Sequence, residues 1–158
     1  MICTIISDDW EYNVKYRNEH DEPYLKIKQQ LRGVIWQLYC DGYDEFYVNC
    51  EYGIPLWSAE IIAALKFYNK ICLKIVTPFE EQCCFWTENE RDRYYAIHKM
   101  ADTVEFACKG YRDNCYSIAD EMMIDKSDLV IIFTKIENKL CAEQYAKEKG
   151  ISFKIIKY

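Results

Sequence analysis

Near-continuous apolar runs alternate along the chain with longer segments in which apolar residues recur at helical spacing. The runs KICLKIV (70–76) and DLVIIF (128–133) are typical of strands buried on both faces of a sheet. Between them, residues such as Ile27, Leu31 and Ile35 fall on one side of a helix. We predict strands over residues 2–6, 45–50, 71–76, 103–108, 129–133 and 152–156. Helices are predicted over residues 24–40, 55–68, 88–100, 116–125 and 138–149.

This alternation of strands and helices predicts an α/β fold, in which helices cover both faces of a mostly parallel, twisted sheet. No repeat or linker divides the chain, so a single domain over residues 1–158 is expected. The third strand is predicted to end at Thr77 and Pro78, because proline cannot donate to a strand ladder.

A ligand in such a sheet is expected beyond the carboxyl ends of the strands, where the strand order reverses. That rule selects residues 7–10, 49–55, 77–82 and 134–139. The segment FYVNCEYGIPLWSAE (46–60) has the order strand, turn, helix that often holds a phosphate, but its turn contains one glycine, Gly53.

Composition narrows the classes of partner. Hydrophobic residues make up 51% of the chain, which predicts a folded globular protein. The 20 Lys and Arg residues face 26 Asp and Glu residues, and no basic cluster stands out, so nucleic acid is not expected as a partner. No apolar run reaches the roughly 18 residues of a membrane span, so no membrane association is expected.

The nine cysteines are predicted to be reduced packing residues of a cytoplasmic protein. Their number is odd, no secretory leader precedes them, and several lie within apolar runs. Cys83 and Cys84 are adjacent, which disfavours a disulfide between them, and no Cys-x-x-Cys or His-rich spacing indicates a metal site. Neither a metal nor a cofactor is expected.

A series of motifs from Phe46 to the C-terminus resembles the YpsA-related family of the SLOG superfamily. These motifs are LWSAE (56–60), PF-x-x-Q-x-x-x-W (78–86), RDRYY (91–95), Y-x-x-x-C (111–115), MMIDKSD (122–128) and QYAKEKGI (144–151). The family comprises bacterial Rossmann-like proteins related to the Lonely Guy phosphoribohydrolases and to the nucleotide-fold part of the DNA-processing protein DprA. The resemblance implies a Rossmann-like three-layer αβα sandwich that binds nucleotides or nucleotide-derived ligands.

The phosphate-contacting turns depart from that family. Its first turn resembles Thr-Gly-His-Arg-Pro, whereas residues 6–10 read ISDDW; its second resembles Ser-Gly-x-x-x-Gly-x-Asp, whereas residues 48–55 read VNCEYGIP. The family's Arg-Asn pair falls on Ala119 and Asp120, and its last Gly-Gly-Thr turn falls on residues 137–139, which read ENK. Acids therefore replace groups suited to an anion.

A phosphate cradle needs glycines in left-handed conformations and backbone N–H groups at a helix start. Asn49 can still adopt a left-handed φ, but we expect the side chains of Cys50, Glu51 and Tyr52 to occupy the place of the phosphate. Pro55 removes one donor from the first helical turn. The sequence therefore predicts a turn with the architecture of a phosphate site and without its binding capacity.

Candidate ligand-binding residues follow from these positions. They are Ser7, Asp8, Asp9, Asn49, Gly53, Trp57, Pro78, Phe79, Asn138 and Lys139. Trp57 and Phe79 could stack on a base, although aromatic residues at such positions are commonly core. Glu60 is the candidate catalytic acid or base, but no basic partner is evident for it at the expected position. Arg93 is expected to pair with acids of its own helix.

The function predicted from the sequence is a non-catalytic module that binds a nucleotide-derived, neutral, cationic or aromatic small ligand. One alternative is an enzyme that cleaves an N-glycosidic bond with Glu60. Another is a protein-interaction scaffold with a vestigial crevice. The tyrosine-rich surface could also form a homodimer interface.

Overall fold

The computed structural model describes residues 1–7, 19–135 and 141–158, which form six strands and five helices. The strands are β1 (Ile2–Ser7), β2 (Glu45–Val48), β3 (Cys72–Phe79), β4 (Thr103–Cys108), β5 (Leu129–Thr134) and β6 (Ser152–Lys157). The helices are α1 (Glu22–Cys40), α2 (Ile54–Lys66), α3 (Glu88–Met100), α4 (Cys115–Ile124) and α5 (Cys141–Lys149).

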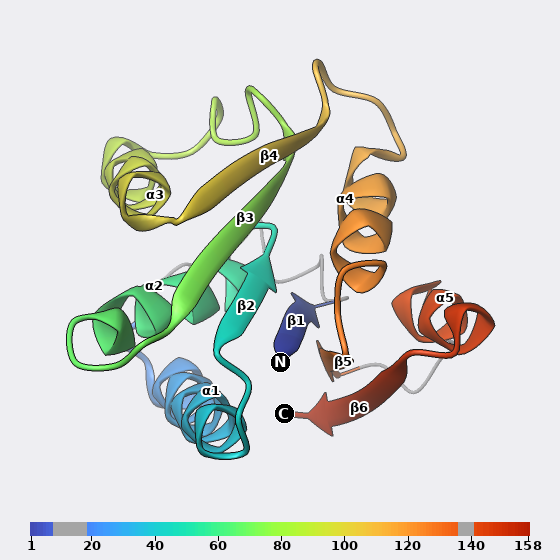
Figure 1. The fold of residues 1–158 in the computed structure, drawn as a ribbon. Coiled ribbons are helices and arrows are strands. Elements are labelled where there is room, and N and C mark those ends of the chain that lie inside the picture. Colours follow the sequence, from blue (N-terminus) through green and yellow to red (C-terminus); the bar gives the residue numbers. More distant parts are fainter. Residues whose placement is uncertain (8–18, 136–140) are drawn as a thin grey trace.

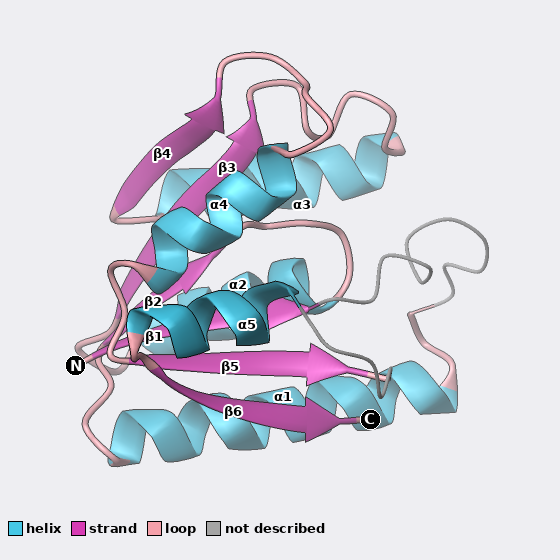
Figure 2. Cartoon of the chain, turned by 90° about the vertical axis from the view of Figure 1, so that its right-hand side faces the viewer, coloured by secondary structure: helices cyan, strands magenta, loops and turns pink. Residues whose placement is uncertain are grey.

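All strands lie in one parallel sheet with the order β4-β3-β2-β1-β5-β6, which confirms the predicted α/β class. Helices α1, α2 and α3 cover one face, and α4 and α5 cover the other, giving three layers (Figure 1). The chain first moves outward from β1 to β4 and then returns to place β5 on the other side of β1. The strand order therefore reverses between β1 and β5, at the end of the sheet where the strand arrowheads lie (Figure 2).

The sheet separates two apolar cores. The larger core lies beneath α1, α2 and α3 and includes Leu31, Phe46 and Ile75. The smaller core lies beneath α4 and α5 and includes Val76 and Met123. Adjacent residues Ile75 and Val76 thus point to opposite faces, as the two-residue period of a strand requires.

Local sequence signals explain where the helices begin. Pro23 lies in the first turn of α1, where its missing N–H costs nothing. Thr87 caps α3: its side chain accepts from the N–H of Glu90, and the Glu90 carboxylate accepts from the N–H of Thr87 at 2.8 Å. Gly53 precedes α2 with φ 102°, a conformation that residues with a Cβ rarely adopt.

Two predicted strand ends are wrong by two residues or more. Strand β3 continues through Pro78 to Phe79, because its pairing with β2 ends at Ile75 and proline is tolerated where one neighbour is missing. Strand β2 ends at Val48 rather than at Cys50, since Asn49 begins the turn and Cys50 has a positive φ of 52°. Helix α5 is described from Cys141, so its predicted start at residue 138 lies outside the described residues.

Two neighbouring residues of α1 test how much its packing against the larger core contributes to the free energy of unfolding. Ile35 is fully buried, whereas its neighbour Trp36 is 47% exposed. We expect Ile35→Ala to lower the free energy of unfolding by about 2–5 kcal/mol, because a cavity remains in a packed core. The matched change Trp36→Ala should cost about 0.5 kcal/mol. Urea unfolding followed by circular dichroism measures both, and equal losses would contradict this packing.

Candidate functional site

The mouth of the sheet is formed by the segments that follow the carboxyl ends of the strands. Ser7 ends β1 and pairs in register with Phe133 of β5, so it lies at the point where the strand order reverses. The candidates Asp8, Asp9, Asn138 and Lys139 lie outside the described residues. The described part of the mouth is therefore built mainly by the segments after β2 and β3 and by α4.

The turn between β2 and α2 uses its own backbone donors. The N–H of Glu51 donates to the side-chain oxygen of Asn49 at 2.9 Å. The N–H of Leu56 donates to the carbonyl of Glu51 at 3.0 Å, and that of Trp57 to the carbonyl of Gly53 at 2.9 Å. Pro55 has no N–H. These positions offer no donor to a phosphate, which supports the expectation that the cradle is lost.

The predicted steric reason for that loss is wrong in two details. Cys50, not Asn49, takes the left-handed conformation. Cys50 is fully buried in the larger core, and Tyr52 is buried there against Trp86, their ring centroids 5.6 Å apart. Two of the three side chains expected to fill the phosphate position thus pack inward, and internal hydrogen bonds close the turn instead.

Four residues, from the segments after β2 and β3 and from α4, meet at the mouth, and we call them the mouth cluster: Asn49, Gln82, Tyr116 and Asp120. The side-chain amide of Asn49 donates to Asp120 Oδ1 at 3.2 Å. Gln82 Nε2 donates to the backbone carbonyl of Asn49 at 3.3 Å. The cluster joins the helix layers on the two faces across the end of the sheet.

Tyr116 is neutral in this environment. Burial, the largest cause, and the nearby Glu51 carboxylate raise the pKa of the Tyr116 phenol, while a hydrogen bond with Gln82 acts in the opposite direction. The phenol therefore keeps its proton at neutral pH and can donate or accept a hydrogen bond.

Gln82 has an unused acceptor. Its side chain is 5% exposed, and no described group donates to its Oε1. A buried carbonyl oxygen without a donor is rare in folded proteins. Sequence reasoning placed Gln82 in a mouth segment but did not select it, although it is the glutamine of the PF-x-x-Q motif.

The aromatic candidates are largely occupied by the protein itself. Phe79 is buried, with the rings of Tyr111 and Tyr116 edge-on to it at 5.3 and 6.0 Å. Trp57 is buried in the first turn of α2, with Tyr24 edge-on at 6.0 Å and Lys28 Nζ over its ring at 4.8 Å. Tyr111, by contrast, is exposed beside Phe79 and could pack against a ring.

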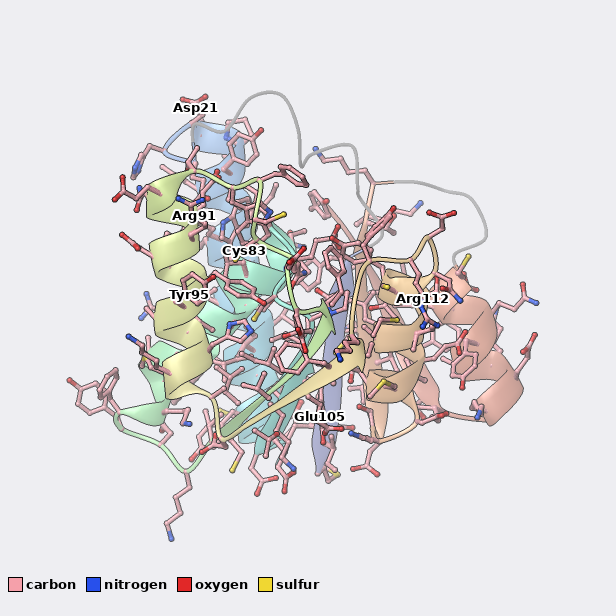
Figure 3. The ribbon with its side chains drawn as sticks, turned by 90° about the horizontal axis from the view of Figure 1, so that it is seen from above. Asp21, Cys83, Arg91, Tyr95, Glu105 and Arg112 are labelled. Carbon is pink, nitrogen blue, oxygen red and sulfur yellow. The ribbon has the colours of Figure 1, made fainter. Side chains whose placement is uncertain are left out.

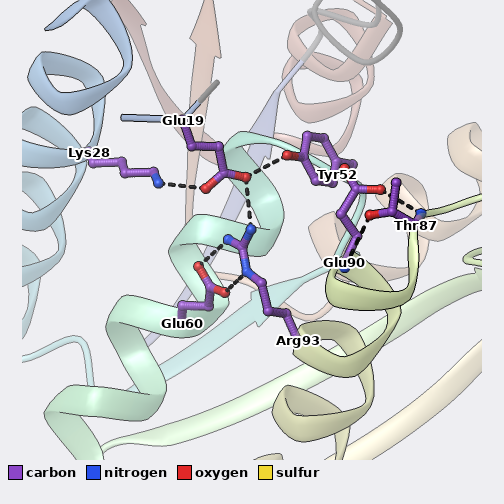
Figure 4. A network of polar contacts seen from close by, with 7 residues as sticks. All are labelled: Glu19, Lys28, Tyr52, Glu60, Thr87, Glu90 and Arg93. Atoms are coloured by element: carbon purple, nitrogen blue, oxygen red, sulfur yellow. Dashed lines mark hydrogen bonds and ion pairs between the residues drawn. The ribbon is translucent and has the colours of Figure 1, made fainter. Parts of the chain in front are cut away.

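Glu60 belongs to an ion-pair network rather than to an open site (Figure 4). Arg93 Nε and Nη2 donate to its two carboxylate oxygens at 2.6 and 2.9 Å. Arg93 Nη1 also donates to Glu19 Oε1 at 2.8 Å, and Lys28 donates to Glu19 Oε2 at 2.6 Å. The prediction that Glu60 lacks a basic partner is wrong. Arg93 does pair with acids, but they come from α2 and from the segment before α1, and not from its own helix as predicted.

This network, comprising Glu19, Lys28, Tyr52, Glu60 and Arg93, controls the protonation of Glu19. Desolvation, the largest cause, favours the neutral acid, but hydrogen bonds from Arg93, Lys28 and Tyr52 outweigh it and hold the pKa of Glu19 at about 2. The Tyr52 hydroxyl donates to Glu19 Oε1 at 2.5 Å. Both oxygens of Glu19 and both of Glu60 therefore accept hydrogen bonds within the protein.

Comparison with known proteins agrees with the fold and the motifs. The sequence model of a protein family, YpsA, described as the YspA SLOG family, matches residues 10–155 of this chain. The chain belongs to this family. It is similar to UPF0398 proteins of Staphylococcus aureus strains JH9, USA300 and COL, each 26% identical over 130 residues. That similarity covers 80% of this chain and 69% of each relative.

Within the described part of this YpsA-family domain, no three or more His, Cys, Asp or Glu side chains gather as a metal site would require. His98 is held by α3 and β3: its ring nitrogens contact the carbonyl oxygen of Tyr94 at 2.8 Å and Thr77 Oγ1 at 3.1 Å. Across the described residues, no helix combines the length and apolarity needed to cross a bilayer.

The network predicts a specific loss of stability in acid. The pKa of Glu19 is about 2 in the folded protein and 4.5 for an ordinary glutamate. Its depressed pKa stabilises the fold above pH 4.5, and that contribution is lost as the pH falls toward 2. Between pH 4.5 and 2 the free energy of unfolding of the wild type should fall. In Glu19→Gln this fall should be smaller by about 1–2 kcal/mol, a modest value because the site is partly hydrated.

The matched control is Glu22→Gln, which removes a carboxylate from an exposed pair with Lys26. Urea unfolding of the three proteins at several pH values between 2 and 7 provides the comparison. The Glu19 variant should also be less stable at neutral pH. If the two variants have the same acid profile, Glu19 does not have the environment described.

Proposed function

We propose that this YpsA-family domain is a non-catalytic module that binds a neutral or cationic nucleotide-derived or aromatic ligand at the mouth of the sheet. The observation that carries the proposal is the buried, undonated Oε1 of Gln82. Leaving such an oxygen without a donor costs about 1–3 kcal/mol. A ligand that brings an N–H or amino group to this oxygen recovers that free energy on binding.

The charge around the mouth cluster favours a donor over an anion. Asp120 lies beside Asn49, and Glu51 is close enough to raise the pKa of Tyr116. Two negative charges about 4 Å apart cost ~4 kcal/mol at the effective dielectric constant of a protein surface. A phosphate at this position would meet that repulsion, and the N–H groups of Glu51, Leu56 and Trp57 already donate within the protein.

The shape of a planar, amine-bearing ring also fits the residues around Gln82. Tyr111 is exposed next to the buried ring of Phe79, and Tyr116 supplies a neutral hydroxyl. Aromatic rings pack edge-on or offset with a gain of about 0.5–1.5 kcal/mol beyond their buried area. A nucleobase or nucleoside with an exocyclic amino group combines the ring and the donor that these residues can accept.

Glu60 does not support the alternative of N-glycosidic cleavage. A general acid or base must exchange a proton with substrate at an oxygen that it can present. Both oxygens of Glu60 accept hydrogen bonds from Arg93, whose guanidinium is always charged. These two hydrogen bonds hold the Glu60 carboxylate against Arg93 of α3.

The binding proposal predicts selectivity for an amino group. Adenosine should raise the melting temperature of the domain, with about 2.7 kcal/mol of stabilisation at a hundredfold excess over Kd. Purine riboside, which has the same ring and sugar without the amino group, should raise it less, and AMP should also raise it less than adenosine. Thermal-shift titrations with the three ligands, and with NAD and ADP-ribose, measure this order.

The variant Gln82→Met removes the acceptor with little change in volume and should abolish the difference between adenosine and purine riboside. Gln29→Met, at an exposed position on α1, is the matched control and should behave as the wild type. A larger shift with AMP or ADP-ribose than with adenosine would contradict the charge argument. No shift with any ligand would favour the scaffold alternative.

The enzyme alternative has its own test. Incubation of the purified domain with AMP or NAD should release no free base, measured by chromatography against a blank without protein. Release that is abolished by Glu60→Gln but retained in the exposed-site variant Glu22→Gln would overturn the non-catalytic assignment. The double comparison matters because Glu60→Gln also weakens the ion pair with Arg93.

A further inference from the structure

The two edges of the sheet differ in how they are protected. Strand β6 forms one edge and carries Lys154 and Lys157, and lysines on an edge strand oppose pairing with another strand. Strand β4 forms the other edge with the sequence TVEFAC, which contains no lysine or proline. Within the described structure β4 pairs only with β3 (Figure 3).

One face of β4 presents uncovered apolar side chains. Val104 pairs in register with Ile75, and Phe106 pairs with Thr77. Ile75 belongs to the core beneath α1, α2 and α3, so Val104 and Phe106 point to that same face. They are nevertheless 36% and 50% exposed.

Helix α3 stops short of these side chains. His98 of α3 contacts Thr77 of β3, and α3 packs mainly against α2. The helix layer on this face therefore covers β3 and leaves the outer half of β4 open. An edge strand with apolar side chains and unpaired backbone groups is a template for another strand.

On the other face of β4, the charge of Glu105 is balanced. Lys126 Nζ donates to both oxygens of Glu105, at 2.6 and 2.7 Å. Glu105 is the single acidic residue in β4, so this pair removes the main electrostatic barrier to a second strand.

The direction of the free backbone groups follows from one hydrogen bond. The N–H of Asp102 donates to the carbonyl of Leu73 at 2.7 Å. The backbone groups of Asp102 therefore point toward β3. Because successive residues of a strand alternate, the N–H and C=O groups of Thr103, Glu105 and Ala107 point outward. These groups can make an antiparallel ladder with a neighbouring strand.

We propose that β4 pairs antiparallel with β4 of a second copy of this chain, so that one sheet runs through both copies. A twofold axis perpendicular to the sheet keeps the exposed apolar face of each copy on the same side. The register places Phe106 opposite Phe106 of the second copy. The two residues form a non-hydrogen-bonded pair, the type of antiparallel pair in which side chains lie closest.

This register is also the one that the charges favour. Glu105 then lies opposite Ala107 of the second copy, with which it exchanges backbone hydrogen bonds, rather than opposite the second Glu105. The diagonal neighbours of Glu105 are then Lys109 of the second copy, which is exposed at the end of the strand, and the second Glu105, whose charge is paired with Lys126. The edge is therefore self-complementary in backbone, apolar side chains and charge. The interface does not depend on the ligand proposed above.

The test is sedimentation velocity of the full chain over concentrations from about 1 to 100 μM, a range that brackets a micromolar Kd. The wild type should form a dimer. Phe106→Lys and Phe106→Glu should each raise the dimer Kd by about 30-fold or more, because equal charges then face each other at the axis. An equimolar mixture of these two variants should dimerise again, because Lys and Glu then face each other.

Two controls separate this interface from general effects. Phe67→Lys replaces a more exposed aromatic residue beyond the end of α2 and should leave the dimer intact. A mixture of Val104→Lys and Val104→Glu should not recover, because the two Val104 side chains are not opposite each other in this register. Circular dichroism confirms that each variant is folded.

Three results would overturn the proposal. A wild-type protein that stays monomeric throughout the range has no such interface. A dimer that survives Phe106→Lys uses another surface. Recovery by the Val104 pair and not by the Phe106 pair would show that the strands meet in a different register.

Discussion

The ion pairs of the Arg93 guanidinium are the interactions on which the helix layer formed by α1, α2 and α3 depends. The guanidinium joins Glu60 of α2 to Glu19, which precedes α1, so one side chain of α3 fixes three parts of the helix layer. A planar guanidinium can serve two carboxylates at once because its donors point in several directions. Lys28 completes the charge balance, with two cations for two carboxylates. Glu19 in turn holds the hydroxyl of Tyr52 and keeps that ring within the helix layer.

The fold could be predicted because buried parallel strands and amphipathic helices leave distinct patterns in sequence. In KICLKIV, Leu73 and Ile75 enter the larger core and Val76 enters the smaller one. Ile27, Leu31 and Ile35 form one stripe on α1. The errors occurred where a tertiary neighbour decides the outcome. Pro78 remains in β3 because β2 has already ended beside it. That information belongs to the pairing of strands and is not contained in the proline itself.

The site could be predicted only as a region. The rule for parallel sheets selected the segments after β2 and β3, and both contribute to the mouth cluster. The individual roles were not accessible, because Glu60 and Arg93 are 33 residues apart and meet only when α2 and α3 pack. Burial of Gln82 likewise depends on Asn49 and α4. The glutamine of the motif was visible in the sequence, but its unused oxygen was not.

The loss of the phosphate cradle and the presence of an unused acceptor have the same consequence for ligand choice. An anion-binding turn offers N–H groups, whereas this turn returns the N–H groups of Glu51 and Leu56 to its own oxygen atoms. In the described part of the mouth, Asp120 accepts from the side-chain amide of Asn49, and no described group donates to Gln82 Oε1. A buried acceptor without a donor costs more free energy than a typical hydrogen bond contributes to stability. A ligand with a hydrogen-bond donor removes that cost. These two features of the described mouth are the reason for proposing a ligand that brings hydrogen-bond donors rather than a phosphate.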